Sequence, residues 1–123
     1  MSSFTVGASM TLTIYHNPRC SKSRQTLALL QENGVEPRIV EYLKTPPDIA
    51  TLAKLAAAVG GARAMLRKGE AEYAALKLDD PNKSDQALLK AMHEHPILIE
   101  RPIVTDGKRA KIGRPPEAVL ALL

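Results

Sequence analysis

The sequence contains one cysteine, Cys20, whose surroundings favour a reactive thiol. Cys20 stands between a strand pattern and a helix pattern, so we expect its thiol at the N-terminus of a helix. The first N–H groups of a helix have no partner within it and carry partial positive charge. These donors, together with the charges of Arg19, Lys22 and Arg24, should lower the pKa of the thiol below its free value of about 8.5. Because the same N–H groups can hold an oxyanion, the segment predicts attack by sulfur on an oxyanion or on another sulfur.

The alternative interpretation is a buried cysteine that acts only as a small hydrophobic side chain. The neighbouring residues disfavour it, because the segment 18–22 contains a proline, an arginine and a lysine, which are poor neighbours in a core. The apolar face of the following helix pattern begins only at Leu27. We therefore predict that Cys20 is a nucleophile.

The missing second thiol constrains the chemistry further. Ser23 occupies the position at which a C-x-x-C dithiol enzyme carries its second cysteine, and the chain has no other cysteine. Any covalent adduct or oxidised form of Cys20 must therefore be released by an external thiol. A secreted disulfide scaffold is excluded for the same reason, and a lone thiol that stays reduced indicates a cytoplasmic protein.

Length and composition indicate one globular domain with an aliphatic core. The chain has 123 residues, of which 45% are hydrophobic and 3% aromatic. Its formal net charge of +4 suits small anions and is too diffuse for a nucleic-acid surface. No apolar run is long enough for a membrane span, and no spacing of ligands predicts a metal site. We expect a single domain over residues 11–123, a disordered tail at residues 1–10, and a monomer.

Three elements near the N-terminus predict a parallel strand–helix–strand unit. Residues 11–15 and 38–43 have the β-branched and aromatic composition of strands. Residues 21–33 have a helical apolar face, and Gly34 follows them as a suitable helix terminator. A strand, a helix and a strand within about thirty residues favour parallel pairing through a right-handed crossover.

The middle of the chain predicts a run of helices. Thr45 is a candidate N-cap with Pro46 in the first turn, and Ser84 is a candidate N-cap further along. The expected helices occupy residues 46–59, 62–68, 70–76 and 85–93.

The last third of the chain returns to strands. Residues 103–105 and 108–112 are expected strands, joined by a tight turn at Asp106-Gly107. A final helix follows, and we expect its apolar side chains to pack on the sheet: Val119, Leu120 and Leu123. The order of elements predicts an α/β fold, a thioredoxin-like mixed sheet with a helical insertion.

Four segments carry a resemblance to a known family. They are Y-H-N-P-R-C-S-K-S-R at 15–24, L-R-K at 66–68, E-R-P-I-V at 100–104 and G-R-P-P-E at 113–117. Their order and spacing resemble the glutaredoxin-linked arsenate reductase family, from about Thr11 to the C-terminus. The best characterised members have Gly-Thr after the cysteine, whereas Ser21-Lys22 resembles the C-S-K-S branch.

The resemblance implies a set of roles. Cys20 would attack arsenate, with glutathione as co-substrate, glutaredoxin as the protein partner and no bound cofactor. Arginine suits an oxyanion because its planar fork binds two oxygens and stays charged. The implied arginines are Arg67, Arg101 and Arg114. The substrate-binding residues that we assign beside the thiol are His16, Ser21, Ser23 and Pro102, the last at a position where the family has a cis proline.

Two alternatives remain open at this point. One is a related glutathione-linked thiol oxidoreductase with another substrate. The other is a non-catalytic, protein-binding regulator similar to Spx, which binds RNA polymerase; Spx typically carries C-x-x-C, and the single cysteine of this chain disfavours that hypothesis.

Overall fold

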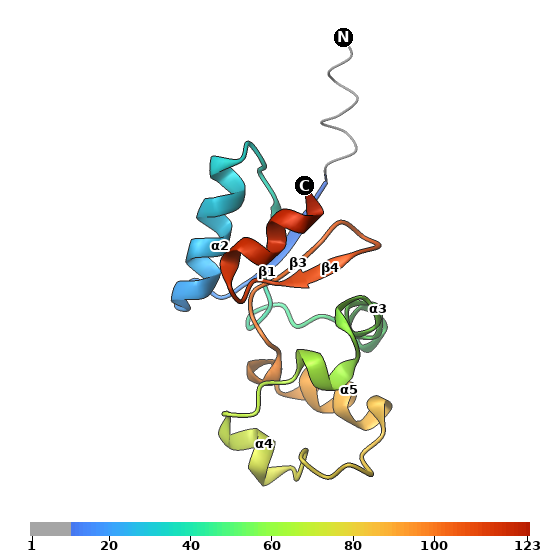
Figure 1. Cartoon of the computed structure of the whole chain (residues 1–123). Helices are drawn as coiled ribbons and strands as arrows, with labels where there is room; N and C mark the ends of the chain where they lie inside the picture. The colour runs from blue at the N-terminus through green and yellow to red at the C-terminus, as the bar shows by residue number, and fades with distance from the viewer. Residues whose placement is uncertain (1–10) are drawn as a thin grey trace. The chain divides into compact units, whose positions relative to one another are not determined.

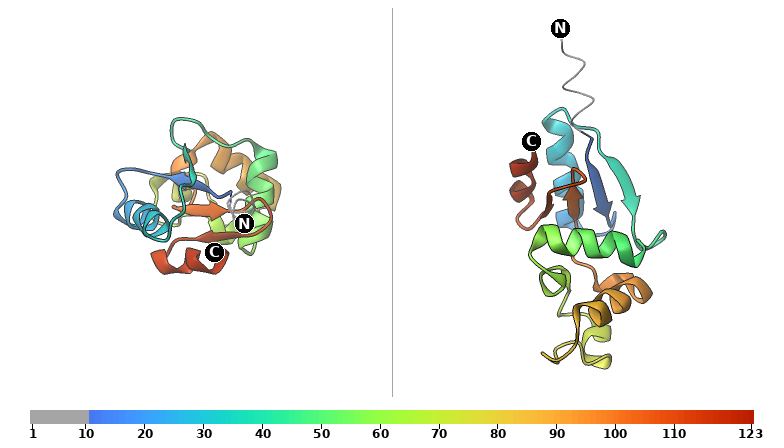
Figure 2. Two further views of the ribbon diagram at one scale, coloured as in Figure 1. Left: turned by 90° about the horizontal axis from the view of Figure 1, so that it is seen from above. Right: turned by 90° about the vertical axis from the view of Figure 1, so that its right-hand side faces the viewer.

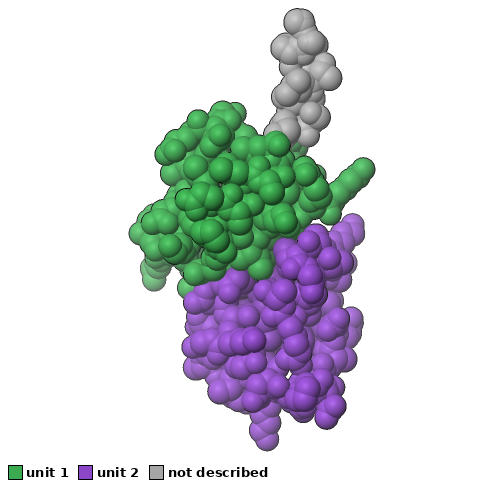
Figure 3. Space-filling model, in the orientation of Figure 1, with its two compact units in different colours: residues 1–41, 101–123 green, residues 42–100 purple. Residues whose placement is uncertain are grey.

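The computed structural model describes residues 11–123, which divide into two compact units. Unit 1 combines the chain up to Glu41 with residues 101–123, and unit 2 is Tyr42–Glu100 (Figure 3). The tail predicted for residues 1–10 lies outside the described residues. The prediction of one domain over residues 11–123 stays a prediction.

Unit 1 contains a four-stranded mixed sheet, which confirms the predicted fold class (Figure 1). Its strand order is β2-β1-β3-β4. The β1–β2 pair is parallel, as the strand–helix–strand pattern predicts, and the other two pairs are antiparallel. The elements of unit 1 are β1 (Thr13–His16), α2 (Ser21–Glu32), β2 (Arg38–Glu41), β3 (Ile103–Thr105), β4 (Ala110–Ile112) and the 3₁₀ helix η3 (Pro116–Leu122).

The helices α2 and η3 lie side by side on one face of this sheet (Figure 2). Ile14 and Val104 are paired across β1 and β3, and both are fully buried. They pack with Leu30 of α2 and with Val119 and Leu122 of η3 in one aliphatic cluster. The short 17–20 connection, which contains Cys20, therefore joins a strand and a helix that pack in the same cluster.

The C-terminal helix differs from the prediction in its period. Val119 is buried as predicted, but Leu123 is 43% exposed and Leu120 only half-buried. Pro116 and Leu122 take the inward positions instead. The reason is that η3 is a 3₁₀ helix, in which every third residue lies on one face.

The β3–β4 turn also differs slightly from the prediction. Strand β4 begins at Ala110, because Asp106 pairs with Arg109 and leaves Gly107-Lys108 at the tip. The N–H groups of Arg109 and Lys108 donate to the Asp106 carboxylate, and with the Arg109 guanidinium they lower its pKa to about 2.

Unit 2 is the predicted helical insertion. Its elements are α3 (Ile49–Val59), η1 (Ala62–Met65), α4 (Ala71–Ala75), α5 (Asp85–Glu94) and η2 (Pro96–Leu98). The Ser84 hydroxyl caps α5 by accepting from the N–H of Ala87, as predicted. The predicted start of α3 is wrong: the cap is Asp48, which accepts from the N–H of Thr51. Pro46 directly precedes Pro47, and a residue before a proline is disfavoured in the helical conformation, so the helix begins only after Pro47.

Two further observations concern the described part of the chain as a whole. Within residues 11–123, no helix has both the length and the apolar composition needed to cross a membrane. In the same range, no three or more histidine, cysteine, aspartate or glutamate side chains are grouped so that they could hold a metal ion.

Candidate active site

Cys20 is the N-cap residue of α2, where the sequence pattern places it. Its backbone is extended, with φ −94° and ψ 124°. The N–H of Cys20 donates to the carbonyl of Asn17 at 3.0 Å, and its own carbonyl accepts the N–H of Arg24. The thiol of Cys20 therefore lies at the N-terminus of α2, where the first backbone N–H groups have no partner within the helix.

The electrostatic surroundings favour the thiolate form. Burial raises the pKa of the Cys20 thiol, but hydrogen bonds from the N–H groups of Ser23 and Lys22 and from the Arg101 side chain outweigh it. The positive charge of Arg101 adds to this effect. The pKa of Cys20 is therefore lowered from its ordinary value, as the sequence predicts.

Two arginines from the distant end of the chain reach this thiol. Arg114 Nη2 lies 3.6 Å from Cys20 Sγ, and Arg114 Nε donates to the carbonyl of Arg101 at 2.9 Å. The bond between Arg101 and Pro102 is cis, as the resemblance implies, and the bond between Arg114 and Pro115 is also cis. The Cys20 sulfur thus lies beside two guanidinium groups that can neutralise an oxyanion.

Arg67, the third predicted arginine, belongs to unit 2. Its Nε pairs with Glu70 Oε2 at 3.1 Å, and its Nη1 pairs with Glu100 Oε1 at 2.9 Å. Two carboxylates therefore already balance this guanidinium. An oxyanion-binding role for Arg67 stays a prediction.

Ser23 lies inside unit 1, and its predicted substrate-binding role stays a prediction. Its side chain is fully buried, and its Oγ lies 2.6 Å from His16 Nδ1 and accepts the N–H of Asn17 at 3.0 Å. Burial lowers the pKa of His16, and Arg24 adds to this while Glu41 opposes it. Ser23 thus positions the 16–20 segment, while Ser21 is exposed at the start of α2.

Sequence reasoning missed the importance of Gly113. Its N–H donates to the carbonyl of Pro102 at 2.9 Å. A Cβ at this position would lie 2.6 Å from Thr26 Oγ1 and 2.8 Å from Pro102 Cγ, both closer than atoms tolerate. Only glycine therefore lets the chain pass between α2 and Pro102 directly before Arg114. The G-R-P-P-E segment carried the signal, because its glycine stands next to the arginine.

We expect Gly113→Ala to destabilise unit 1 by about 1–3 kcal/mol, the usual effect of overpacking a close contact. It should also raise the pKa of Cys20, because the Arg101–Pro102 and Arg114 segments must separate from α2. Urea unfolding and the pH dependence of thiol alkylation measure both effects. Gly69→Ala is the matched control, since nothing lies within 4 Å of its added Cβ. Equal stabilities of the two variants would contradict the close contact.

The depressed pKa of Cys20 predicts its alkylation profile. Only the thiolate reacts with iodoacetamide, so the rate should rise with pH and level off at a lower pH than for an unperturbed thiol. Arg101→Ala removes a hydrogen bond and a charge that favour the thiolate, so it should move the midpoint upward. Arg38→Ala, at an exposed arginine of β2, should leave the midpoint in place. An unshifted midpoint in the wild type would contradict the activation of this thiol.

Comparisons with known proteins agree with this geometry. The model of the ArsC family matches residues 15–122. A protein of Escherichia coli strain K12, named uncharacterized protein YfgD, is 54% identical over 112 residues, which are 89% of this chain and 94% of that protein. An arsenate reductase of Rhizobium meliloti strain 1021 is 50% identical over 115 residues, 93% of this chain and 82% of that protein.

Solved structures give the same result. The arsenate reductase from Vibrio cholerae superposes with a TM-score of 0.90 at 50% sequence identity. The match covers 94% of this chain and 99% of that chain. The family match over residues 15–122 extends over both units and includes every segment that carries a predicted site residue.

Proposed function

Because the chain belongs to the ArsC family, we propose that it is an arsenate reductase in which Cys20 is the nucleophile and glutathione the co-substrate. The observation that carries this proposal is the pair of guanidinium groups beside a thiol at the N-terminus of α2, with Arg114 Nη2 3.6 Å from Cys20 Sγ. Attack on an oxyanion requires an electron-rich sulfur and positive charge around the oxyanion. The Cys20 thiol supplies the first, and the guanidinium groups of Arg101 and Arg114 supply the second beside it.

In the first step Cys20 Sγ attacks arsenic. A sulfur–arsenic bond forms, one arsenic–oxygen bond breaks, and the oxygen leaves as water after taking two protons, one of them from the thiol. Arsenic stays at oxidation state five. Arg101 and Arg114 neutralise the charge on the remaining oxygens, an electrostatic role that is worth several kcal/mol in a water-poor site.

In the second step the sulfur of glutathione attacks Cys20 Sγ. A disulfide forms between the two sulfurs, and the sulfur–arsenic bond breaks. Its electron pair leaves with arsenic, which becomes arsenite at oxidation state three, and the glutathione proton moves to an arsenite oxygen. The two sulfurs supply both electrons, so no bound cofactor is needed.

The third step follows from the single cysteine. No second thiol of this chain can open the mixed disulfide, so an external thiol must attack it. We propose that glutaredoxin catalyses this exchange. A second glutathione is consumed, Cys20 returns to its thiol, and oxidised glutathione is released. Such a cycle requires the glutathione pool of a reducing cytoplasm.

An assay that couples arsenate to NADPH oxidation through glutathione, glutathione reductase and glutaredoxin tests the proposal. We expect oxidation that requires arsenate, glutathione and glutaredoxin together, and that thioredoxin without glutathione does not support. If the folded protein with an alkylatable Cys20 gives no arsenate-dependent oxidation, the proposal is wrong. Capture of RNA polymerase by the inactive protein would then favour the regulator hypothesis.

A further inference from the structure

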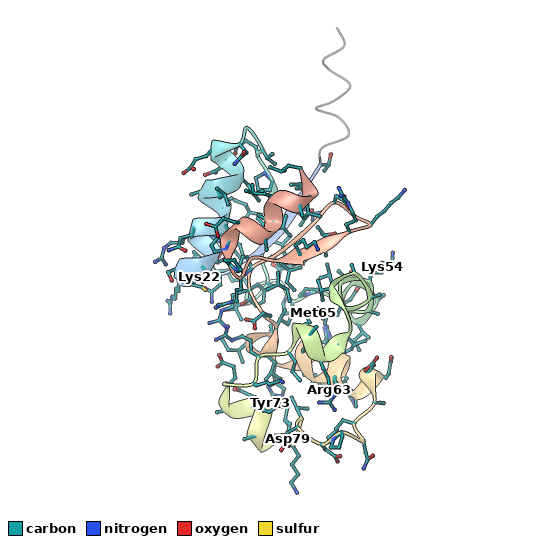
Figure 4. The ribbon with its side chains drawn as sticks, viewed as in Figure 1. Lys22, Lys54, Arg63, Met65, Tyr73 and Asp79 are labelled. Atoms are coloured by element: carbon teal, nitrogen blue, oxygen red, sulfur yellow. The ribbon has the colours of Figure 1, made fainter. Side chains whose placement is uncertain are left out.

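A short two-stranded ladder in unit 2 ends directly before Arg101. Leu66 and Ile99 pair in an isolated antiparallel bridge, and both side chains are buried. Beside this bridge, the N–H of Glu100 donates to the carbonyl of Met65 at 2.7 Å; Figure 4 labels Met65. The backbone that leads into Arg101 is therefore fixed by its pairing with the segment 65–67.

Arg67 joins this ladder with its backbone and with its side chain. Its N–H donates to the carbonyl of Leu98 at 2.7 Å. Its guanidinium makes two ion pairs, from Nη1 to Glu100 Oε1 at 2.9 Å and from Nε to Glu70 Oε2 at 3.1 Å. The three charged side chains are 22% to 23% exposed, so water screens these ion pairs less than it screens fully exposed ones.

The residue that follows Glu100 is held at a second point. The carbonyl of Arg101 accepts a hydrogen bond from Arg114 Nε at 2.9 Å, and the Arg101 side chain donates to the sulfur of Cys20. Because Glu100 and Arg101 are consecutive, the ladder and the Arg114 contact together restrict the backbone from which the Arg101 side chain extends. The direction in which Arg101 reaches the thiol thus depends on how firmly Glu100 is held.

We propose that the Arg67–Glu100 ion pair positions Arg101 beside the thiol. Arg67 then acts through Arg101 and does not itself touch the oxyanion. Glu70 binds the Nε edge of the Arg67 guanidinium, which leaves the Nη1 edge turned toward Glu100. Such support keeps a reactive group within a narrow range of geometry. The proposal rests on the function proposed above for what Arg101 does to arsenate, but its first test needs no arsenate.

The pH midpoint of Cys20 alkylation by iodoacetamide reports the contact between Arg101 and the sulfur. Arg67→Gln and Glu100→Gln should both move this midpoint upward by about half a pH unit, roughly a threefold loss of thiolate well below the midpoint. Charges that act only through space would give opposite shifts, because the Arg67 cation favours the thiolate and the Glu100 carboxylate disfavours it. Shifts in opposite directions would overturn the proposal.

The Arg101→Ala background tests whether the ion pair acts through Arg101. Without that guanidinium, Arg67→Gln and Glu100→Gln should not move the midpoint further. In the protein that retains Arg101, the double variant should match the single variants, since the loss of either partner removes the same ion pair. Additive shifts in either experiment would mean that the two residues act independently and would contradict the proposal.

Arg63 is the matched control within the same unit. Its Nη1 and Nη2 donate to the carbonyls of Leu78 and Asp80 at 2.9 Å and 2.6 Å, and Figure 4 labels it. Arg63→Gln should therefore lower the stability of unit 2 toward urea without moving the midpoint. Glu94→Gln, at an exposed carboxylate of α5, should change neither quantity. A midpoint that rises as much with Arg63→Gln as with Arg67→Gln would show a general loosening of unit 2 and no specific positioning.

Arg67→Lys is the second variant in case Arg67→Gln does not fold. Lysine keeps the charge but lacks the fork that binds both carboxylates, so it should give a midpoint between those of the wild type and Arg67→Gln. A midpoint that stays at the wild-type value in Arg67→Lys and in Glu100→Gln alike would overturn the proposal.

Arsenate kinetics separate positioning from direct binding of the oxyanion by Arg67. Positioning predicts that Arg67→Gln and Glu100→Gln lower kcat/KM together, each about threefold. Direct binding predicts that Arg67→Gln raises KM while Glu100→Gln lowers it, because a competing carboxylate is lost; this result would overturn the proposal. The expected midpoints in a protein without arsenate turnover would refute arsenate as the substrate and keep the positioning role.

Discussion

Cys20→Ser is expected to reduce arsenate turnover to the rate without enzyme, while the protein stays folded. A serine hydroxyl is almost entirely protonated at neutral pH, so the surrounding donors cannot supply a comparable nucleophile, and no disulfide with glutathione can form. The side chain of Cys20 is only partly buried and lies outside the aliphatic cluster. Serine is also a favoured N-cap, so α2 should keep its first turn.

The coupled assay and thermal unfolding, carried out together, check this prediction. We expect Cys20→Ser to have the same Tm as the wild type and to have lost turnover. Turnover well above background in Cys20→Ser would mean that another group reacts with arsenate. Loss of folding would be uninformative about chemistry, and Cys20→Ala would then provide the second variant.

Arg101→Lys and Arg114→Lys are each expected to lower kcat/KM for arsenate tenfold or more, about 1.4 kcal/mol of transition-state stabilisation. Lysine keeps the charge but loses the planar fork, so the change tests geometry apart from simple attraction. At Arg114 the change to lysine also removes the Nε–H that donates to the carbonyl of Arg101.

The control for these variants has to be an arginine without structural contacts. Arg109 lies outside the four segments that carry the resemblance. It nevertheless pairs with Asp106 and donates to the carbonyls of Ala121 and Leu122. Its replacement therefore disturbs the hairpin and η3. Arg38→Lys, at an exposed position of β2, is the better control. If Arg101, Arg114 and Arg38 tolerate lysine equally, the two arginines do not hold the oxyanion.

The fold was predictable wherever a local signal is decisive. The β-branched strands around α2, the Ser84 cap and the terminating glycines all act within a few residues, and the structure has these elements in place. The errors arose where two local signals compete. Pro46 suits a first turn but also precedes Pro47, and the leucines of η3 fit a helix of 3.6 residues per turn as well as one of three.

The sequence predicts the reactive cysteine of the site better than it predicts the residues that surround it. A cysteine before a helix pattern fixes the environment of the thiol, because the open N–H groups follow from the helix itself. The contact between Arg114 and Cys20 spans 94 residues, so only the resemblance could suggest it. The burial of Ser23 against His16 and the tight passage at Gly113 depend on tertiary packing, which no local pattern encodes.

A single turnover without glutaredoxin tests the central claim most directly. Reduced protein is mixed with arsenate and glutathione, arsenite is quantified, and the intact protein is weighed. The mechanism predicts one arsenite per protein and, in equal amount, one glutathione disulfide-bonded to Cys20, with neither product when arsenate is omitted. Arsenite without the Cys20 disulfide, or the disulfide at the same rate without arsenate, would contradict it.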